Sequence, residues 1–336
     1  MKKDYSVSCS RFVAMCFIVL CHIMQYDSFS TSIYGGEEIE WAFWFNVGVQ
    51  MFLFLSGYLY GKKEKFNTIS FYKKSFPKLL VDYYVFLILV LIIIKIIPIW
   101  SISVDEIKDL FLMSNVSQGL GHLWFVRTIL FCYLFTPILF EIINYFNKHS
   151  DFKFYIYSLN FLILVHIILI KHFPYFSPAW INCYILGMLY SKRENKSQIK
   201  IFEISTIVLS LSMVLMQFRV DYFNGSLPNI IMNKYQFFCE YGHVLLGISL
   251  IFIIRYIFNY FFKGKEFVIL NWSDKYSYDV YLTHHIFIQS PIACVNFISR
   301  RFIAIPLAIF LSVITAVVLY NLSKYVKYYS KNIFHY

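Results

Sequence analysis

The chain has 336 residues, of which 59% are hydrophobic, 21% aromatic and only 15% charged. A soluble domain of this length cannot bury so much apolar surface, so the composition excludes a soluble globular protein. The net charge of +11 could suit a nucleic-acid partner. However, Lys and Arg gather in alternate short loops, as membrane orientation requires, and we predict no nucleic-acid partner.

The apolar segments predict an all-α polytopic membrane protein with a bundle of about ten transmembrane helices. We expect one transmembrane domain over residues 1–336 and no soluble domain. The lysine-rich loops share the parity of the two chain ends, which predicts that both termini are cytoplasmic. The approximate centres of the ten spans are Ile18, Met51, Leu89, Cys132, Leu162, Cys183, Leu209, Ile248, Ile288 and Val313.

The first predicted helix, residues 11–26, carries Arg11 at its start and His22 eleven positions later. It could be a signal peptide, but no small-residue cleavage site follows it, so we expect an uncleaved span. Eleven residues make roughly three helical turns, which places both side chains on one face about 16 Å apart. His22 could transfer protons or only hydrogen-bond a neighbouring helix. Arg11 could contribute to the same site or snorkel to the interface.

The second predicted helix, residues 41–60, contains Ser56 and Gly57 in an otherwise apolar run. A glycine here permits close approach of another helix or of a ligand, and the sequence does not separate the two. The predicted loop that follows, residues 62–78, holds six lysines, Lys73, Lys74 and Lys78 among them. These could set topology and attract anionic membrane lipids, or hold a phosphate-bearing cytosolic donor.

Three of the histidines in or beside later spans are candidate site residues. Residues 119–125 read GLGHLWF at the outer start of the fourth span, where His122 and Trp124 could be interfacial anchors or could bind a sugar. His284 and His285 lie in the ninth span, about 100° apart around the helix, so we expect at most one of them to face any given cavity. There is no C-x-x-C pair, H-E-x-x-H motif or P-loop, and we predict no metal site.

Taken together, these residues resemble the acyltransferase 3 family of integral-membrane O-acyltransferases. The likeness rests on an Arg and a His separated by ten residues (Arg11 and His22), a Phe-rich Ser-Gly-Tyr segment (Phe52–Tyr58), a His-Leu-Trp-Phe segment (His122–Phe125) and Tyr-Leu-x-His (Tyr281–His284). It spans most of the chain. The family often has an Arg-x-x-Arg pair in its first cytosolic loop. Here the equivalent stretch is Ser75–Lys78, with Lys73 and Lys74 upstream.

The resemblance implies transfer of an acyl group, usually acetyl, from cytosolic acyl-CoA to a hydroxyl of a surface polysaccharide or its lipid-linked precursor, in the plasma (inner) membrane. It implicates His22 and Arg11 in catalysis. We expect acetyl-CoA to contact Ser56, Gly57, Lys73, Lys74 and Lys78, and the carbohydrate acceptor to contact His122, Trp124 and His284. The alternatives are a membrane transporter of glycans or small molecules, and a glycan polymerase, which would need a longer outer loop.

Overall fold

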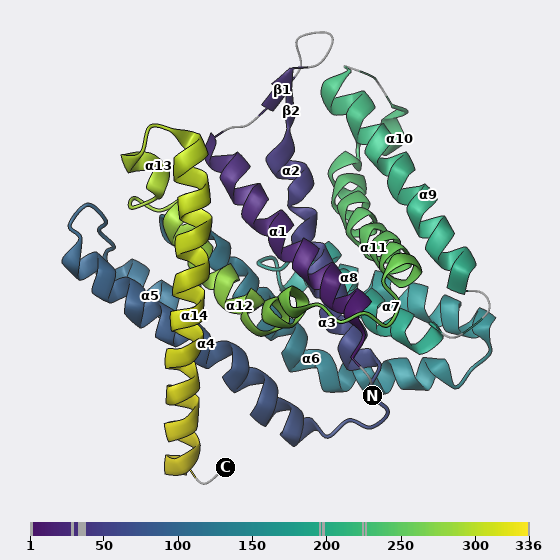
Figure 1. Ribbon diagram of the computed structural model, residues 1–336. Helices are drawn as coiled ribbons and strands as arrows, with labels where there is room; N and C mark the ends of the chain where they lie inside the picture. The colour runs from purple at the N-terminus through teal and green to yellow at the C-terminus, as the bar shows by residue number, and fades with distance from the viewer. Residues whose placement is uncertain are drawn as a thin grey trace. The chain divides into compact units, whose positions relative to one another are not determined.

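The computed structural model describes residues 3–27, 30–32, 38–194, 196, 199–223, 225 and 227–334. Helices make up most of it (Figure 1). Their bounds are α1 Tyr5–Asp27, α2 Trp41–Phe45, α3 Val47–Gly61, α4 Thr68–Ile96, α5 Val104–Leu112, η1 Gly121–Leu123, α6 Trp124–Asn147, α7 Asp151–His172, α8 Pro178–Arg193, α9 Ile199–Gln217, η2 Phe218–Tyr222, α10 Asn229–Met232, α11 Tyr235–Phe261, α12 Val268–Ile288, α13 Cys294–Phe297 and α14 Arg301–Phe334. The strands β1 Ser30–Ser32 and β2 Glu38–Glu40 pair antiparallel.

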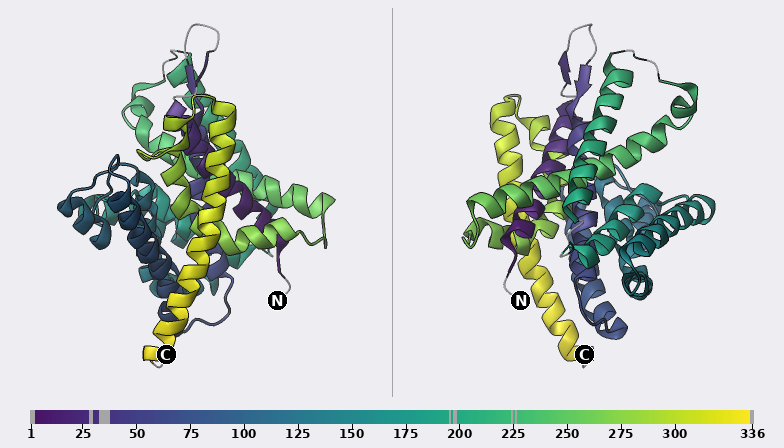
Figure 2. Two further views of the ribbon diagram at one scale, coloured as in Figure 1. Left: turned by 60° about the vertical axis from the view of Figure 1, so that its left-hand side comes forward. Right: turned by 90° about the vertical axis from the view of Figure 1, so that its right-hand side faces the viewer.

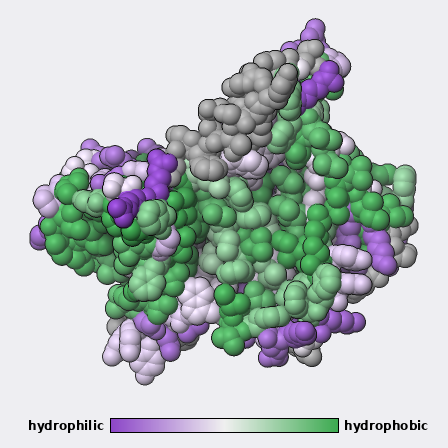
Figure 3. All heavy atoms as spheres, turned by 45° about the horizontal axis from the view of Figure 1, so that its top comes forward, coloured by the Kyte–Doolittle hydropathy of each residue, from purple (hydrophilic) through white to green (hydrophobic). Residues whose placement is uncertain are grey.

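The predicted all-α polytopic class is confirmed. Within the described ranges, eight segments are long and apolar enough to cross a membrane. Helices α8 and α12 occupy the positions of the other two predicted spans, but α8 has only 16 residues and α12 carries Asp274, Lys275 and Asp279. The count of ten and the cytoplasmic termini therefore stay predictions. Hydrophobic residues cover most of the face drawn in Figure 3, as contact with lipid requires.

The helices group into two compact units that alternate along the sequence. The first comprises Met1–Cys21, Ser28–Phe66 and Phe135–Asn271. At its centre α3 packs against α8. A Cβ atom on Gly57 would lie 1.9 Å from the carbonyl oxygen of Tyr184, and one on Gly187 would lie 2.1 Å from that of Phe54. Small residues thus let these two helix backbones approach closely, as in many membrane bundles.

The second unit comprises His22–Asp27, Asn67–Leu134 and Trp272–Tyr336. Its long helices α4 and α14 pack against each other (Figures 1 and 2). Lys327 of α14 forms an ion pair with the buried Asp82 of α4 at 2.6 Å. Helix α5 contacts α4, and the hydroxyl of Tyr83 on α4 donates a 2.6 Å hydrogen bond to the carbonyl oxygen of Leu110 on α5. This unit holds the site described below.

Two predicted loops contain helix instead. Helix α4 already begins at Thr68, because the Asn67 side chain caps it by accepting a 2.8 Å hydrogen bond from the Ser70 backbone. Only residues 62–67 of the predicted lysine loop are therefore loop. The predicted outer loop of residues 98–122 likewise contains α5. Residues 33–37 of the predicted loop between the first two spans lie outside the described residues.

Candidate active site

Four imidazole rings form a compact cluster in the second unit. His22 comes from the end of α1, His122 from η1, and His284 and His285 from α12. The ring centroid of His22 lies 5.2 Å from that of His284 and 4.7 Å from that of His285. The ring of His122 lies 5.2 Å and 4.4 Å from the same two rings. Residues separated by more than 250 positions thus meet at one place.

Hydrogen bonds between η1 and α12 hold this cluster in place. Nε2 of His122 donates to the carbonyl oxygen of Leu282 at 3.0 Å, and Nδ1 of His285 donates to that of Gly119 at 2.9 Å. The Tyr281 hydroxyl adds a third bond, to the carbonyl oxygen of His122. Gly119 has a φ of 78°, a conformation that glycine adopts without strain.

The carbonyl partners fix which nitrogens carry protons. Because a carbonyl only accepts, His122 is protonated on Nε2, and His284 is protonated on Nδ1, which donates to the Tyr281 carbonyl at 2.7 Å. The remaining nitrogens, Nδ1 of His122 and Nε2 of His284, are buried and have no hydrogen-bond partner within the described ranges. Each therefore presents a lone pair that a hydroxyl group can satisfy.

His22 is the most accessible member of the cluster. It is half-buried, whereas His122, His284 and His285 are 2%, 0% and 4% exposed. A general base must reach the proton that it removes, so accessibility favours His22 for this role. The three buried rings then line the site around it.

The structure brings together His22, His122 and His284, three residues that the sequence singled out. The expectation that at most one of His284 and His285 faces a given cavity is wrong, since the rings of both approach those of His22 and His122. An imidazole extends several ångströms from the helix backbone. The side chains of His284 and His285 can therefore both reach the ring of His22, although they leave α12 in directions about 100° apart. Of the two alternatives for His122, an interfacial anchor fits poorly, because the side chain is buried.

The family model of the acyltransferase domain matches residues 4–321, nearly the whole chain. The chain belongs to the acyltransferase 3 family. It is therefore an acyl-transfer enzyme and a multi-pass membrane protein. No curated protein and no solved structure matches it.

The sequence also assigned Arg11 of this acyltransferase to catalysis and Trp124 to acceptor binding. Arg11 is half-buried on α1, three turns before His22 on the same continuous helix. Trp124 is half-buried at the first position of α6, where its ring centroid lies 6.0 Å from that of Phe125. Their roles stay predictions.

The residues assigned to the acyl donor fall into two groups. Close packing against α8 accounts for the glycine at Gly57, and Ser56 is half-buried beside it on α3. Lys73, Lys74 and Lys78 are exposed on the first turns of α4. Lys74 and Lys78 are four positions apart and so share one helix face, where they can act as point charges for phosphates. Their contact with the donor stays a prediction.

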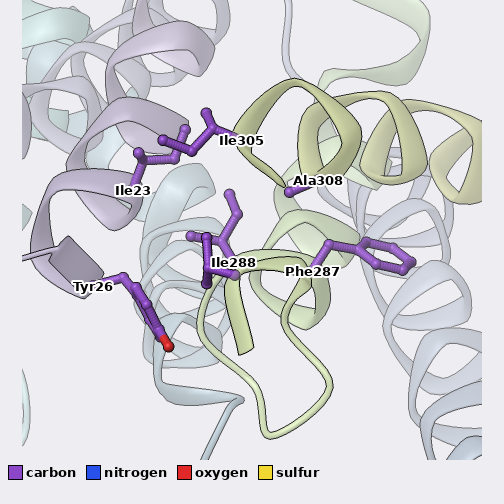
Figure 4. A pocket seen from close by; sticks show the side chains of 7 residues that line it. Ile23, Tyr26, Phe287, Ile288, Ile305 and Ala308 are labelled. Carbon is purple, nitrogen blue, oxygen red and sulfur yellow. The ribbon is translucent and has the colours of Figure 1, made fainter. Parts of the chain in front are cut away.

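Two further observations concern metal ligands and pockets in the described residues. Among the described residues, no group of three or more His, Cys, Asp and Glu side chains has the geometry of a metal site. An apolar pocket in the same unit has a volume of about 10 Å³, room for about one water molecule (Figure 4). The pocket is lined by Ile23, Tyr26, Phe287, Ile288, Val295, Ile305 and Ala308. It is too small for an acyl chain and marks where α1, α12 and α14 pack together.

Proposed function

We propose that this enzyme transfers an acyl group from cytosolic acyl-CoA to a hydroxyl of a carbohydrate, and that the acyl group is acetyl. The acceptor is a cell-surface polysaccharide or its lipid-linked precursor, and the enzyme works in the plasma (inner) membrane. The family supports acyl transfer. The observation that carries the proposal is the histidine cluster, in which accessible His22 lies beside three buried rings, two of which have an unsatisfied lone pair.

His22 is the general base in this proposal. Its imidazole takes the proton from the acceptor hydroxyl, and the oxygen attacks the thioester carbonyl of acyl-CoA. The carbon–sulfur bond breaks as the ester carbon–oxygen bond forms. The imidazolium then returns the proton to the CoA thiolate, so that the enzyme ends the cycle unchanged. An imidazole suits this exchange because its pKa ordinarily lies near neutrality.

The buried lone pairs favour an acceptor with several hydroxyl groups. Nδ1 of His122 and Nε2 of His284 can each accept a hydrogen bond from a hydroxyl next to the one that reacts. A sugar provides such neighbouring hydroxyls, and an indole such as that of Trp124 can pack on its apolar face. This pattern supports a carbohydrate over a simple alcohol.

Positive charge supports the cytosolic donor. Lys73, Lys74 and Lys78 are exposed on one short stretch of α4 and can attract the phosphates of CoA. Ser56 and Gly57 on α3 are the proposed contacts of the pantetheine arm, and Arg11 is proposed to orient polar groups of the donor. Anionic membrane lipids compete for the same lysines.

The test compares His22→Ala with His166→Ala in a strain that lacks the native gene. His166 lies on α7, where its Nδ1 is 2.9 Å from the Tyr241 hydroxyl, so its substitution controls for loss of an intramembrane histidine. We expect His22→Ala to abolish acetyl esters on the surface polysaccharide while the polysaccharide itself is still exported, and His166→Ala to retain them. Normal acetylation by correctly inserted His22→Ala would refute the proposal. Loss of export instead of loss of esters would favour the transporter.

A further inference from the structure

The C-terminal end of α1 carries a polar chain that leads to His22. Nδ1 of His22 lies 2.8 Å from Oε1 of Gln25, one helical turn later. Gln289, directly after α12, donates from Nε2 to the carbonyl oxygen of His22 at 2.8 Å and to Oε1 of Gln25 at 3.3 Å. Gln25 of α1 and Gln289, which follows α12, therefore converge on the residue that we propose as the base.

The direction of these bonds assigns the tautomer of His22. Oε1 of Gln25 accepts a hydrogen from the amide of Gln289, so it is the oxygen and not the nitrogen of the Gln25 side chain. An oxygen cannot donate, so Nδ1 of His22 must carry the hydrogen between them. Nε2 of His22 is then the nitrogen with the lone pair, the one that can remove a proton.

We propose that Gln25 and Gln289 are positioning residues that hold His22 in the tautomer with Nε2 free to act as the base. This inference rests on the proposed function. Gln25 accepts the Nδ1 hydrogen and fixes the ring, and Gln289 fixes Gln25 and ties the end of α12 to α1. An orienting hydrogen bond on the second nitrogen of an imidazole is a common way to set its reactive tautomer.

The surroundings of His22 make the pH profile a direct readout. The titratable groups whose rings face it are the imidazoles of His122, His284 and His285. A carboxylate at position 25 would still accept the Nδ1 hydrogen but would also stabilise the imidazolium. A base works only when unprotonated, so such a change must move the acid limb of the pH–rate profile to higher pH.

The experiment uses the full chain in membrane vesicles with radiolabelled acetyl-CoA and purified host surface polysaccharide. We expect Gln25→Leu to lower kcat about tenfold with an unchanged KM for acetyl-CoA, since one orienting hydrogen bond is lost. We expect Gln25→Glu to keep at least half of the maximal rate, with its acid limb about one pH unit higher. Because Gln25 is exposed, neither change should impair folding.

Gln289 provides an independent variant. We expect Gln289→Leu to lower kcat, and the double variant with Gln25→Leu to lose little more than Gln25→Leu alone, because Gln289 orients the His22 ring through Gln25. Tyr26→Phe is the matched control. It removes the hydrogen bond from Tyr26 to Asn296 in the same turn of α1 without touching His22, and its kcat should stay within twofold of wild type.

The outcomes separate this inference from the proposed function. If His22→Ala retains activity, the proposed function itself fails. If His22→Ala is inactive, but Gln25→Leu keeps the wild-type kcat and Gln25→Glu keeps the wild-type acid limb, the assigned role of the two glutamines is wrong.

Discussion

His122 and His285 stack with ring centroids 4.4 Å apart and ring planes inclined by 23°. Each ring also donates a hydrogen bond to the backbone of the other's segment, His122 to Leu282 and His285 to Gly119. The two segments therefore support each other through both side chains. We expect η1 and the end of α12 to behave as one rigid wall of the site.

This reciprocal arrangement predicts the effect of His285→Phe. Phenylalanine preserves the stacked ring but leaves the buried carbonyl of Gly119 without its side-chain donor. A buried acceptor left unsatisfied costs about 1–3 kcal/mol. We expect a lower thermal unfolding midpoint for the detergent-solubilised protein, and an unchanged midpoint would show that this bond contributes no stability.

Alanine substitutions at Gly119 and Gly121 form a matched pair. Comparing their stabilities separates the cost of backbone strain and steric overlap from the effect of replacing a glycine in general. A Cβ on Gly119 would lie 2.9 Å from Cβ of Ser290 and would sit at a φ of 78°, whereas one on Gly121 would meet nothing within 4 Å. We expect Gly119→Ala to destabilise the protein by about 2–3 kcal/mol and Gly121→Ala by less than about 1 kcal/mol. Denaturation of purified protein measures both, and equal losses would contradict the geometry.

Gly57 tests whether helix packing or donor binding requires the Ser-Gly pair. Gly57→Ala would force α3 away from the Tyr184 backbone of α8, so we expect it to lower the amount of folded protein about tenfold or more. Ser56→Ala leaves that contact in place. If Ser56 touches the donor, its variant should fold normally and show a raised KM for acetyl-CoA. A normally folded Gly57→Ala protein would contradict the close approach.

Glu194 makes the stability of the first unit depend on pH in the acidic range. Its carboxylate accepts from Arg255 at 2.7 Å and from Lys62 at 2.9 Å. Burial raises the pKa of the Glu194 carboxyl, but these two cations and the Tyr58 hydroxyl outweigh it, so the pKa lies below its usual value of 4.5.

A carboxyl whose pKa is lowered by folding stabilises the folded state at neutral pH. That contribution is fully present above about pH 4.5 and is lost as the pH falls through the lowered value. We therefore expect the wild-type midpoint to fall more between pH 7 and pH 4 than that of Glu194→Gln. At pH 7 the variant should be less stable by about 1.5–3 kcal/mol. If the unfolding midpoints of both proteins changed in parallel with pH, protonation of Glu194 would not be coupled to folding.

The lysines of α4 predict a salt-dependent donor affinity. Replacing Lys73, Lys74 and Lys78 together by Gln should raise the KM for acetyl-CoA several-fold at low salt, and the difference should shrink as ionic strength rises. Lys171→Gln, at the end of α7, is a control for the loss of a lysine elsewhere. Equal KM values at all salt concentrations would remove these residues from the donor site.

The apolar segments alone predicted the positions of most of the long helices, because a membrane span is recognised from local composition. The starts of α4 and α5 were missed although the signals were present. Asn67 precedes Ser70 at a helix cap, and Ser103 with Glu106 forms a capping box. Lysines and Pro77 made the first of these segments resemble a loop.

The site itself was predictable only in part. His22 and His284 were candidates because ionisable side chains within membrane spans are usually functional, and His122 because of the GLGHLWF segment at the start of a span. The sequence could not show that η1 and the ends of α1 and α12 meet, so neither the participation of His285 nor the link from Gln289 to His22 could be derived. Gln25 could have been proposed from the sequence, because it is a polar residue one helical turn after His22.

Helix α14 has 34 residues, or about 51 Å at 1.5 Å per residue, whereas a typical hydrocarbon layer is about 30 Å thick. A helix of this length crosses the layer at a tilt or extends beyond it, and the end that carries Lys324 and Lys327 is polar enough to extend into the interface. Since Lys327 anchors that end to Asp82 of α4, a change of tilt in one helix must be followed by the other. The acyl-chain length of the surrounding phospholipids should therefore act on this enzyme mechanically, through the pair of helices that borders them.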